Sequence, residues 1–200
     1  MGSLSFFVRN DTGLGLPNEP WPQEHDADTD KQILLHIRGK TQRRKLTNAD
    51  ELKTLLETKY RANVTVLSDA WLAYTFEKQS STYNQYQYII TAHGAHLANG
   101  FFCRVGTKIV EIFCNKHHHD LNPDPTLTER GDASFKDWFG GSYAQWFETF
   151  TRRLGIDHFE RGENHPERCG TAADGHFSDI DIHIPEALPL IVNRFGLVPR

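Results

Sequence analysis

Short apolar runs alternate with amphipathic segments through the middle of the chain, and this alternation constrains the fold more than any other feature. The runs at 32–38, 62–68, 88–92 and 108–114 are rich in β-branched residues, which predicts buried strands. The segments at 48–60, 70–85 and 97–103 lie between them and predict helices. Strands that alternate with helices favour a parallel sheet covered on both faces. The predicted fold class is therefore α/β, with a doubly wound, mostly parallel sheet.

Local signals refine this prediction. Asn48 stands three residues before Glu51, as in a capping box, so we expect Asn48 to cap the helix at 48–60. Gly155 is a suitable residue to end a helix at 143–155. The alternating sequence at 179–184 predicts a further strand, and 185–195 predicts a closing helix with a proline in its first turn.

Charge and hydropathy exclude two classes of partner. The chain has 200 residues, of which 38% are hydrophobic and 24% charged, as in a soluble globular protein. Its formal net charge of -4 provides no general attraction to nucleic acid or to a membrane surface. No apolar run approaches the roughly 18 residues that span a bilayer. We therefore predict no nucleic-acid partner and no membrane segment.

The ends and the cysteines bear on location. The first ten residues lack the basic start and apolar centre of a signal peptide. Cys103, Cys114 and Cys169 are too few and too widely spaced for a disulfide framework or a zinc site. We predict a cytoplasmic location; the alternative is a soluble piece of a longer or Golgi- or ER-resident protein. The final Leu197–Arg200 matches the scar of a thrombin cleavage site, and we exclude it from functional reasoning.

Polar residues gather where the predicted strands end. Arg38 ends the first strand, His93–Gly94 follows the third, and Glu111 lies inside the fourth near the same edge. Ligands of doubly wound sheets bind beyond the carboxyl ends of the strands. The turn at His93 and Gly94 could serve packing alone, but its position also suits an anionic ligand.

A longer series of residues resembles a known family. The series consists of Arg38, Arg43 with Arg44, Asn48 and Glu51, Gln79, His93-Gly94-Ala95, Leu97, Asn99 and Glu111. In this order and spacing, over residues 32 to 115, it is similar to the carboxyl-terminal half of glycosyltransferase family 61 proteins. His96 and Ala98 depart from the pattern, since small or apolar residues and threonine are common at these positions in the family.

The resemblance implies a function and a fold. It implies transfer of a sugar from a nucleotide sugar, a UDP-sugar, to a glycan or protein-linked acceptor. It implies inversion, no required cofactor and no metal. It also implies a Rossmann-like half of a GT-B enzyme, with 32–196 as the nucleotide-sugar-binding domain and 1–31 as an arm or a remnant of the acceptor-side region. The acceptor-side domain, the usual source of the general base, is absent or much reduced in this chain.

The resemblance also implies site residues, and their chemistry suits a diphosphate. Arg38 and Arg43 offer guanidinium groups to phosphate oxygens. Gly94 and Ala95 allow a backbone to approach closely, at the start of a helix whose N–H groups favour anions. His93 is the predicted catalytic residue, acting electrostatically on the leaving group. Glu111 could accept hydrogen bonds from a ribose. The remaining predicted binding residues are Asn48, Gln79 and Asn99.

Other interpretations stay open. The basic loop around Arg43 could be solvated, Asn48 and Glu51 could serve only as a helix cap, and Glu111 could be paired for structural reasons. The histidines at 117–119 suggest a metal site, but consecutive histidines cannot easily face one ion. The rival functions are a non-catalytic nucleotide-sugar-binding module, a fragment that needs a partner domain, and, last, a metal-dependent hydrolase.

Overall fold

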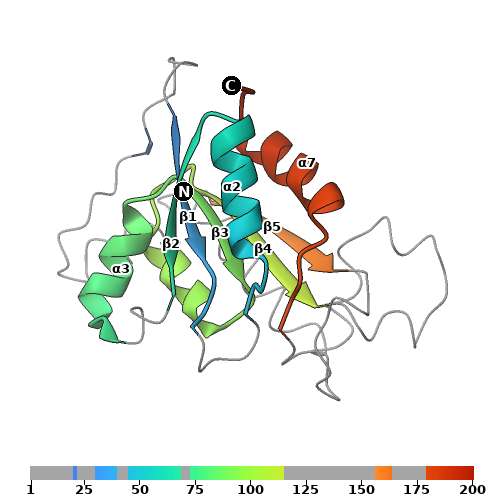
Figure 1. Cartoon of the computed structure of the whole chain (residues 1–200). Helices are drawn as coiled ribbons and strands as arrows, with labels where there is room; N and C mark the ends of the chain where they lie inside the picture. Colours follow the sequence, from blue (N-terminus) through green and yellow to red (C-terminus); the bar gives the residue numbers. More distant parts are fainter. Residues whose placement is uncertain (1–19, 22–29, 40–44, 69–72, 115–155, 164–178) are drawn as a thin grey trace, which may run out of the picture.

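The computed structural model describes residues 20–21, 30–39, 45–68, 73–114, 156–163 and 179–200. These residues form one α/β unit with a parallel sheet at its centre (Figure 1). The strands are β1 (Lys31–His36), β2 (Ala62–Leu67), β3 (Tyr88–Ala92), β4 (Lys108–Cys114) and β5 (Asp157–Glu163). The helices are α2 (Ala49–Lys59), α3 (Phe76–Asn84), the 3-10 helix η2 (Ala95–Phe102) and α7 (Ile184–Phe195).

The strand order creates a crevice at one place on the sheet edge. The order is β2-β1-β3-β4-β5, and each neighbouring pair is parallel. The chain moves outward from β1 to β2 and then returns past β1 to form β3. This reversal makes the β1/β3 boundary the topological switch point, where ligands of such sheets bind. The carboxyl ends of β1 and β3 therefore position the candidate site.

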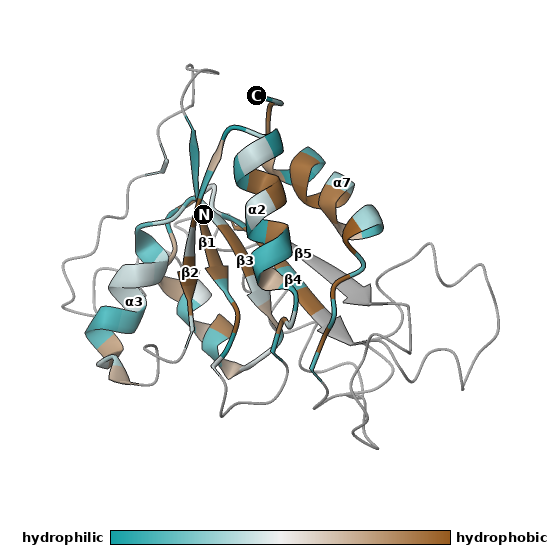
Figure 2. Ribbon diagram, in the orientation of Figure 1, coloured by the Kyte–Doolittle hydropathy of each residue, from teal (hydrophilic) through white to brown (hydrophobic). Residues whose placement is uncertain are grey.

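Both faces of the sheet are covered, as predicted. α2 and α7 pack on one face, in a cluster of buried apolar residues that includes Leu35, Leu56 and Ile191. α3 and η2 cover the other face, in a smaller cluster that includes Leu34 and Leu97. Crossovers of one hand that run in opposite directions lie on opposite faces, which explains why α2 and α3 are separated. Figure 2 shows that α7 and α3 differ in hydropathy: α7 is largely brown (hydrophobic), whereas α3 is mostly teal and white.

Two predictions about secondary structure are wrong, and one strand was missed. The segment at 179–184 is not a strand, since only a single bridge joins Ile180 to Leu46 before α7 begins. Its alternating pattern instead reflects Ile180 and Ile182 entering the core beside α2. The helix at 97–103 is a 3-10 helix that begins at Ala95. β5 was missed because its sequence, DHFERGE, is charged and carries little hydrophobic periodicity.

The predicted side-chain cap of α2 is also wrong. Asn48 precedes α2, but its side chain makes no capping hydrogen bond. Asn48 Nδ2 donates to the carbonyl oxygen of Ile182 at 2.8 Å, and the N–H of Ile182 donates to Asn48 Oδ1 at 2.7 Å. The amide therefore ties the start of α2 to the segment before α7. The two bonds to Ile182 orient the amide toward that segment, and it makes no bond to the helix terminus.

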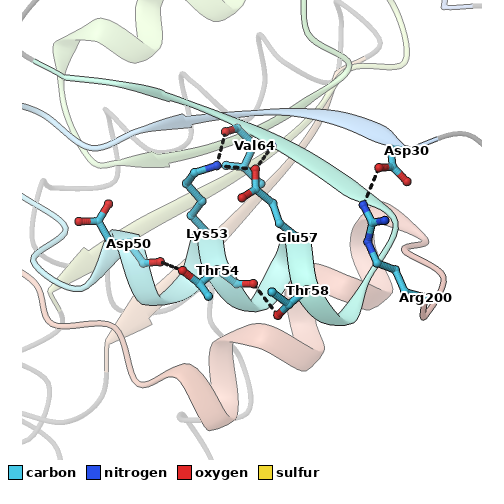
Figure 3. A network of polar contacts seen from close by, with 8 residues as sticks. All are labelled: Asp30, Asp50, Lys53, Thr54, Glu57, Thr58, Val64 and Arg200. Atoms are coloured by element: carbon cyan, nitrogen blue, oxygen red, sulfur yellow. Dashed lines mark hydrogen bonds and ion pairs between the residues drawn. The ribbon is translucent and has the colours of Figure 1, made fainter.

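The amino-terminal arm and the last residues both contact the sheet. Trp21 Nε1 donates to Thr107 Oγ1 at 3.0 Å, at the amino edge of β4 and away from the crevice. Leu197 is buried in the α2/α7 core, and Arg200 binds the carboxylate of Asp30 at 2.5 Å. Figure 3 shows this pair beside the Lys53–Glu57 pair of α2. The final residues are thus packed on the fold; the prediction that they are a scar stays a prediction.

Several predictions lie outside the described residues. They concern Arg43, Arg44, the helix at 143–155, the histidines at 117–119, Cys169 and most of the arm at 1–31. Among the described residues, no helix is long and apolar enough to cross a membrane. The predicted domain boundaries and cytoplasmic location stay predictions.

Candidate functional site

A row of polar side chains crosses the sheet near its carboxyl edge. His36 on β1 pairs in register with Thr91 on β3, and Thr91 pairs with Glu111 on β4. The alternation of side chains along each strand directs all three to the α3/η2 face. Each is at most 3% exposed. Buried polar groups are costly unless they are hydrogen-bonded, so their partners define the site.

The row lies under a pocket of about 610 Å³ between α3 and η2, next to the switch point. This volume lies within the usual range of small-molecule sites. The pocket is lined by His36, Arg38, Phe76, Gln79, Ala95, His96, Ala98, Asn99, Phe101 and Phe102. It therefore combines one guanidinium, two amides and an aromatic wall, a set that suits a ligand with an anionic end and a planar end.

Arg38 is held at this pocket by an unusual backbone. Its φ of 57° lies in the left-handed region, which residues other than glycine rarely adopt. Strain of this kind costs on the order of 1–3 kcal/mol and is often found at functional sites. Arg38 Nη1 donates to the carbonyl oxygen of His93 at 3.0 Å, which joins the ends of β1 and β3.

Gly94 makes the position of Arg38 possible. A Cβ atom at Gly94 would lie 2.8 Å from Arg38 Nη1 and 2.9 Å from His96 Nδ1. Both distances are shorter than real contacts to a Cβ atom. The glycine therefore leaves room for two side chains of the protein itself. Its predicted role in the approach of the backbone to a ligand stays a prediction.

Two histidines beneath the pocket are neutral. Burial, together with the positive charge of Arg38, lowers the pKa of His36 to about 3. Burial also holds the pKa of His96 well below its usual value, with His36 and Arg38 adding to the effect. Their rings lie 4.3 Å apart, and they bond to Tyr83 Oη at 3.0 Å and Thr91 Oγ1 at 2.7 Å, respectively. The positive charge among these groups therefore resides on Arg38.

His93 and Glu111 form a buried pair behind the pocket. His93 Nδ1 and Glu111 Oε1 are in direct contact, and the two residues are 6% and 3% exposed. Neither is among the residues that line the pocket. The backbone of His93 contributes more directly, because its carbonyl oxygen holds Arg38.

The structure brings some of the predicted site residues together and separates others. Arg38, Gln79, Ala95 and Asn99 line the same pocket, with Gly94 and His93 directly beside it. Glu111 lies behind His93, and its predicted contact with a ribose stays a prediction. Asn48 is not a lining residue, and both groups of its amide bind Ile182.

Sequence reasoning missed His36, Phe76, Phe101 and Phe102, and treated His96 only as a departure from a pattern. His36 offered a signal, because it is polar within an apolar run and ends a strand. The aromatic residues offered none, since phenylalanines near helices are usually core residues. Among the described residues, no group of three or more histidines, cysteines and acidic residues could hold a metal ion.

The comparison with protein families bears directly on this site. Residues 16–110 match the family model Glycosyltransferase 61. The match confirms the resemblance and extends it upstream into the arm, over just under half of the chain. It covers β1 to β3, η2 and every residue that lines the pocket. No curated protein matches the chain. The family match indicates glycosyltransferase activity, which uses a sugar donor and an acceptor.

Proposed function

We propose that the pocket at the switch point binds a nucleotide-sugar donor, a UDP-sugar, and that the chain is the donor-side domain of a glycosyltransferase. One observation carries the proposal: four residues predicted from sequence for donor binding line one pocket at the β1/β3 crevice. Arg38 would bind the diphosphate, since a guanidinium matches phosphate oxygens in geometry and charge.

The proposed chemistry is a single displacement with inversion. The acceptor hydroxyl oxygen forms a bond to the anomeric carbon as the bond from that carbon to the diphosphate oxygen breaks. The diphosphate leaves with the electron pair, and the hydroxyl proton passes to a general base. Arg38 stabilises the charge that develops on the leaving group. We place that base in an acceptor-side region, in keeping with a GT-B arrangement.

His93 has an indirect role in this proposal. Its carbonyl oxygen orients Arg38, and its ring is fixed by Glu111. We therefore propose that His93 positions Arg38 and does not itself touch the donor. The reaction would need no metal, because the guanidinium and the exposed start of η2 face the diphosphate.

Titration with UDP tests the proposal. UDP should raise the melting temperature, because a ligand that binds only the folded state stabilises it. Arg38→Ala should weaken UDP binding by roughly 10- to 100-fold, as expected for a lost hydrogen bond to a charged group. Arg194→Ala, which removes an exposed arginine from α7, is the matched control and should bind UDP normally. No shift with any nucleotide, or equal losses in both variants, would contradict the proposal.

The alternative is a non-catalytic module that binds a nucleotide sugar and acts with a partner domain. It shares the pocket and differs in turnover. Release of UDP from a UDP-sugar in the presence of acceptor glycans distinguishes the two, and repeating the assay with EDTA tests metal independence.

A further inference from the structure

Three phenylalanines, Phe76, Phe101 and Phe102, line the pocket, and the ring of Phe76 is unusually exposed. Phe76 is 55% exposed, although it is a large apolar side chain that begins α3. The rings of Phe76 and Phe102 form an edge-to-face pair, with 5.2 Å between their centroids and an interplanar angle of 83°. The edge contact fixes Phe76 and leaves ring surface uncovered at the pocket. An exposed aromatic ring beside a pocket favours a stacking ligand.

The backbone at Phe76 is fixed as well. Thr75 caps α3, with its side chain accepting a hydrogen bond from the N–H of Lys78 at 3.3 Å. Phe76 therefore projects from the first turn of a capped helix, which gives its ring a defined position. A fixed platform loses little conformational entropy when a ligand stacks on it.

Two amides in the same pocket present acceptors. Gln79 Nε2 donates to the carbonyl oxygen of Tyr74 at 3.2 Å, and Asn99 Nδ2 donates to that of His96 at 3.0 Å. These bonds fix both amides. In the part of the chain that the structure describes, no hydrogen bond reaches the carbonyl oxygen of either amide. The two oxygens can accept N–H groups of a bound ring.

We propose that the wall formed by Phe76, Phe101 and Phe102 binds the nucleobase of the donor. Phe76 stacks on the base, and the amide oxygens of Gln79 and Asn99 accept hydrogen bonds from its N–H groups. Arg38 lines the same pocket and takes the phosphates. This inference rests on the proposed function, and it orients the donor along the pocket with its base between α3 and η2.

A ligand series measured by calorimetry tests the orientation. The ligands are UDP, uridine, inorganic diphosphate and glucose 1-phosphate. Phe76→Ala should weaken UDP and uridine by about 5- to 150-fold, the usual effect of removing an aromatic platform from one base. It should leave diphosphate and glucose 1-phosphate unchanged. Phe76→Trp should restore binding of UDP and uridine. Val198→Ala, at another large apolar residue that is exposed, is the control and should change nothing.

The outcomes separate this inference from the proposed function. If UDP binds and Phe76→Ala leaves its affinity unchanged, the base lies elsewhere and only the inference fails. Equal losses for UDP and diphosphate would assign Phe76 a structural role and also overturn it. A loss for glucose 1-phosphate that matches the loss for uridine would place the sugar on the wall. If no nucleotide binds the unmodified protein, both the inference and the proposed function fail.

Discussion

The α2/α7 face of the sheet is covered by a continuous apolar core, whereas the α3/η2 face combines a smaller core with buried polar side chains and a pocket. Both faces are built from the same strands, and neighbouring residues such as Leu35 and His36 point to opposite sides. The comparison suggests a division of roles. The α2/α7 face supplies most of the buried apolar surface that stabilises the domain. The α3/η2 face holds polar side chains that are costly to bury unless they form hydrogen bonds.

The test with the largest expected effect truncates one buried leucine on each face of the sheet. Leu56 on α2 and Leu97 on η2 are 0% and 2% exposed. Leu56→Ala and Leu97→Ala should each lower the free energy of unfolding by about 2–5 kcal/mol, the usual cost of a core leucine. Only Leu97→Ala should also weaken UDP binding, because Leu97 supports η2 beneath the pocket. Urea unfolding and calorimetry measure the two effects. Equal losses of UDP affinity would refute the division.

A smaller effect concerns the contact between Gly94 and Arg38. Gly94→Ala should weaken UDP binding by roughly 10- to 100-fold, because the new methyl group displaces the guanidinium that we propose binds phosphate. A double-mutant cycle with Arg38→Ala gives the sharper result. If Gly94 acts through Arg38, then adding Gly94→Ala to Arg38→Ala should cost little further affinity. Additive losses would show that Gly94 serves the ligand directly, as the sequence first suggested.

The smallest effect is a dependence of stability on pH that comes from the polar face. His36 and His96 have a folded-state pKa below the unfolded value of 6.5. The unfolded chain therefore binds more protons, and stability falls as the pH drops below about 7. Between pH 7 and pH 6 each neutral histidine should cost about 0.7 kcal/mol of unfolding free energy. His36→Gln, whose amide can still hydrogen-bond to Tyr83 Oη, should remove about half of this dependence in urea unfolding; an unchanged slope would contradict it.

The sequence determined the elements whose signals are local. Apolar runs of five to seven residues predicted β1 to β4, and the amphipathic segments between them predicted α2 and α3. A proline in the first turn and an apolar stripe placed α7. Strand ends alone placed Arg38 and His93-Gly94 at one edge of the sheet, because the carboxyl ends of parallel strands share an edge. Gln79, Ala95 and Asn99 were singled out only by the resemblance to glycosyltransferase family 61.

Only the tertiary structure decided which partners those residues take. Asn48 carries a capping-box signal, yet its amide binds Ile182, a residue more than a hundred positions away. A Cβ atom at Gly94 would meet Arg38 and His96, two side chains that the local sequence could not place there. Strand register brings His36, Thr91 and Glu111 into one polar row. Phe76 lines the pocket because the crossover from β2 to β3 places α3 on that face of the sheet. Local sequence fixes period and propensity, whereas register and crossover direction depend on how distant segments pack, and these decide which side chains meet.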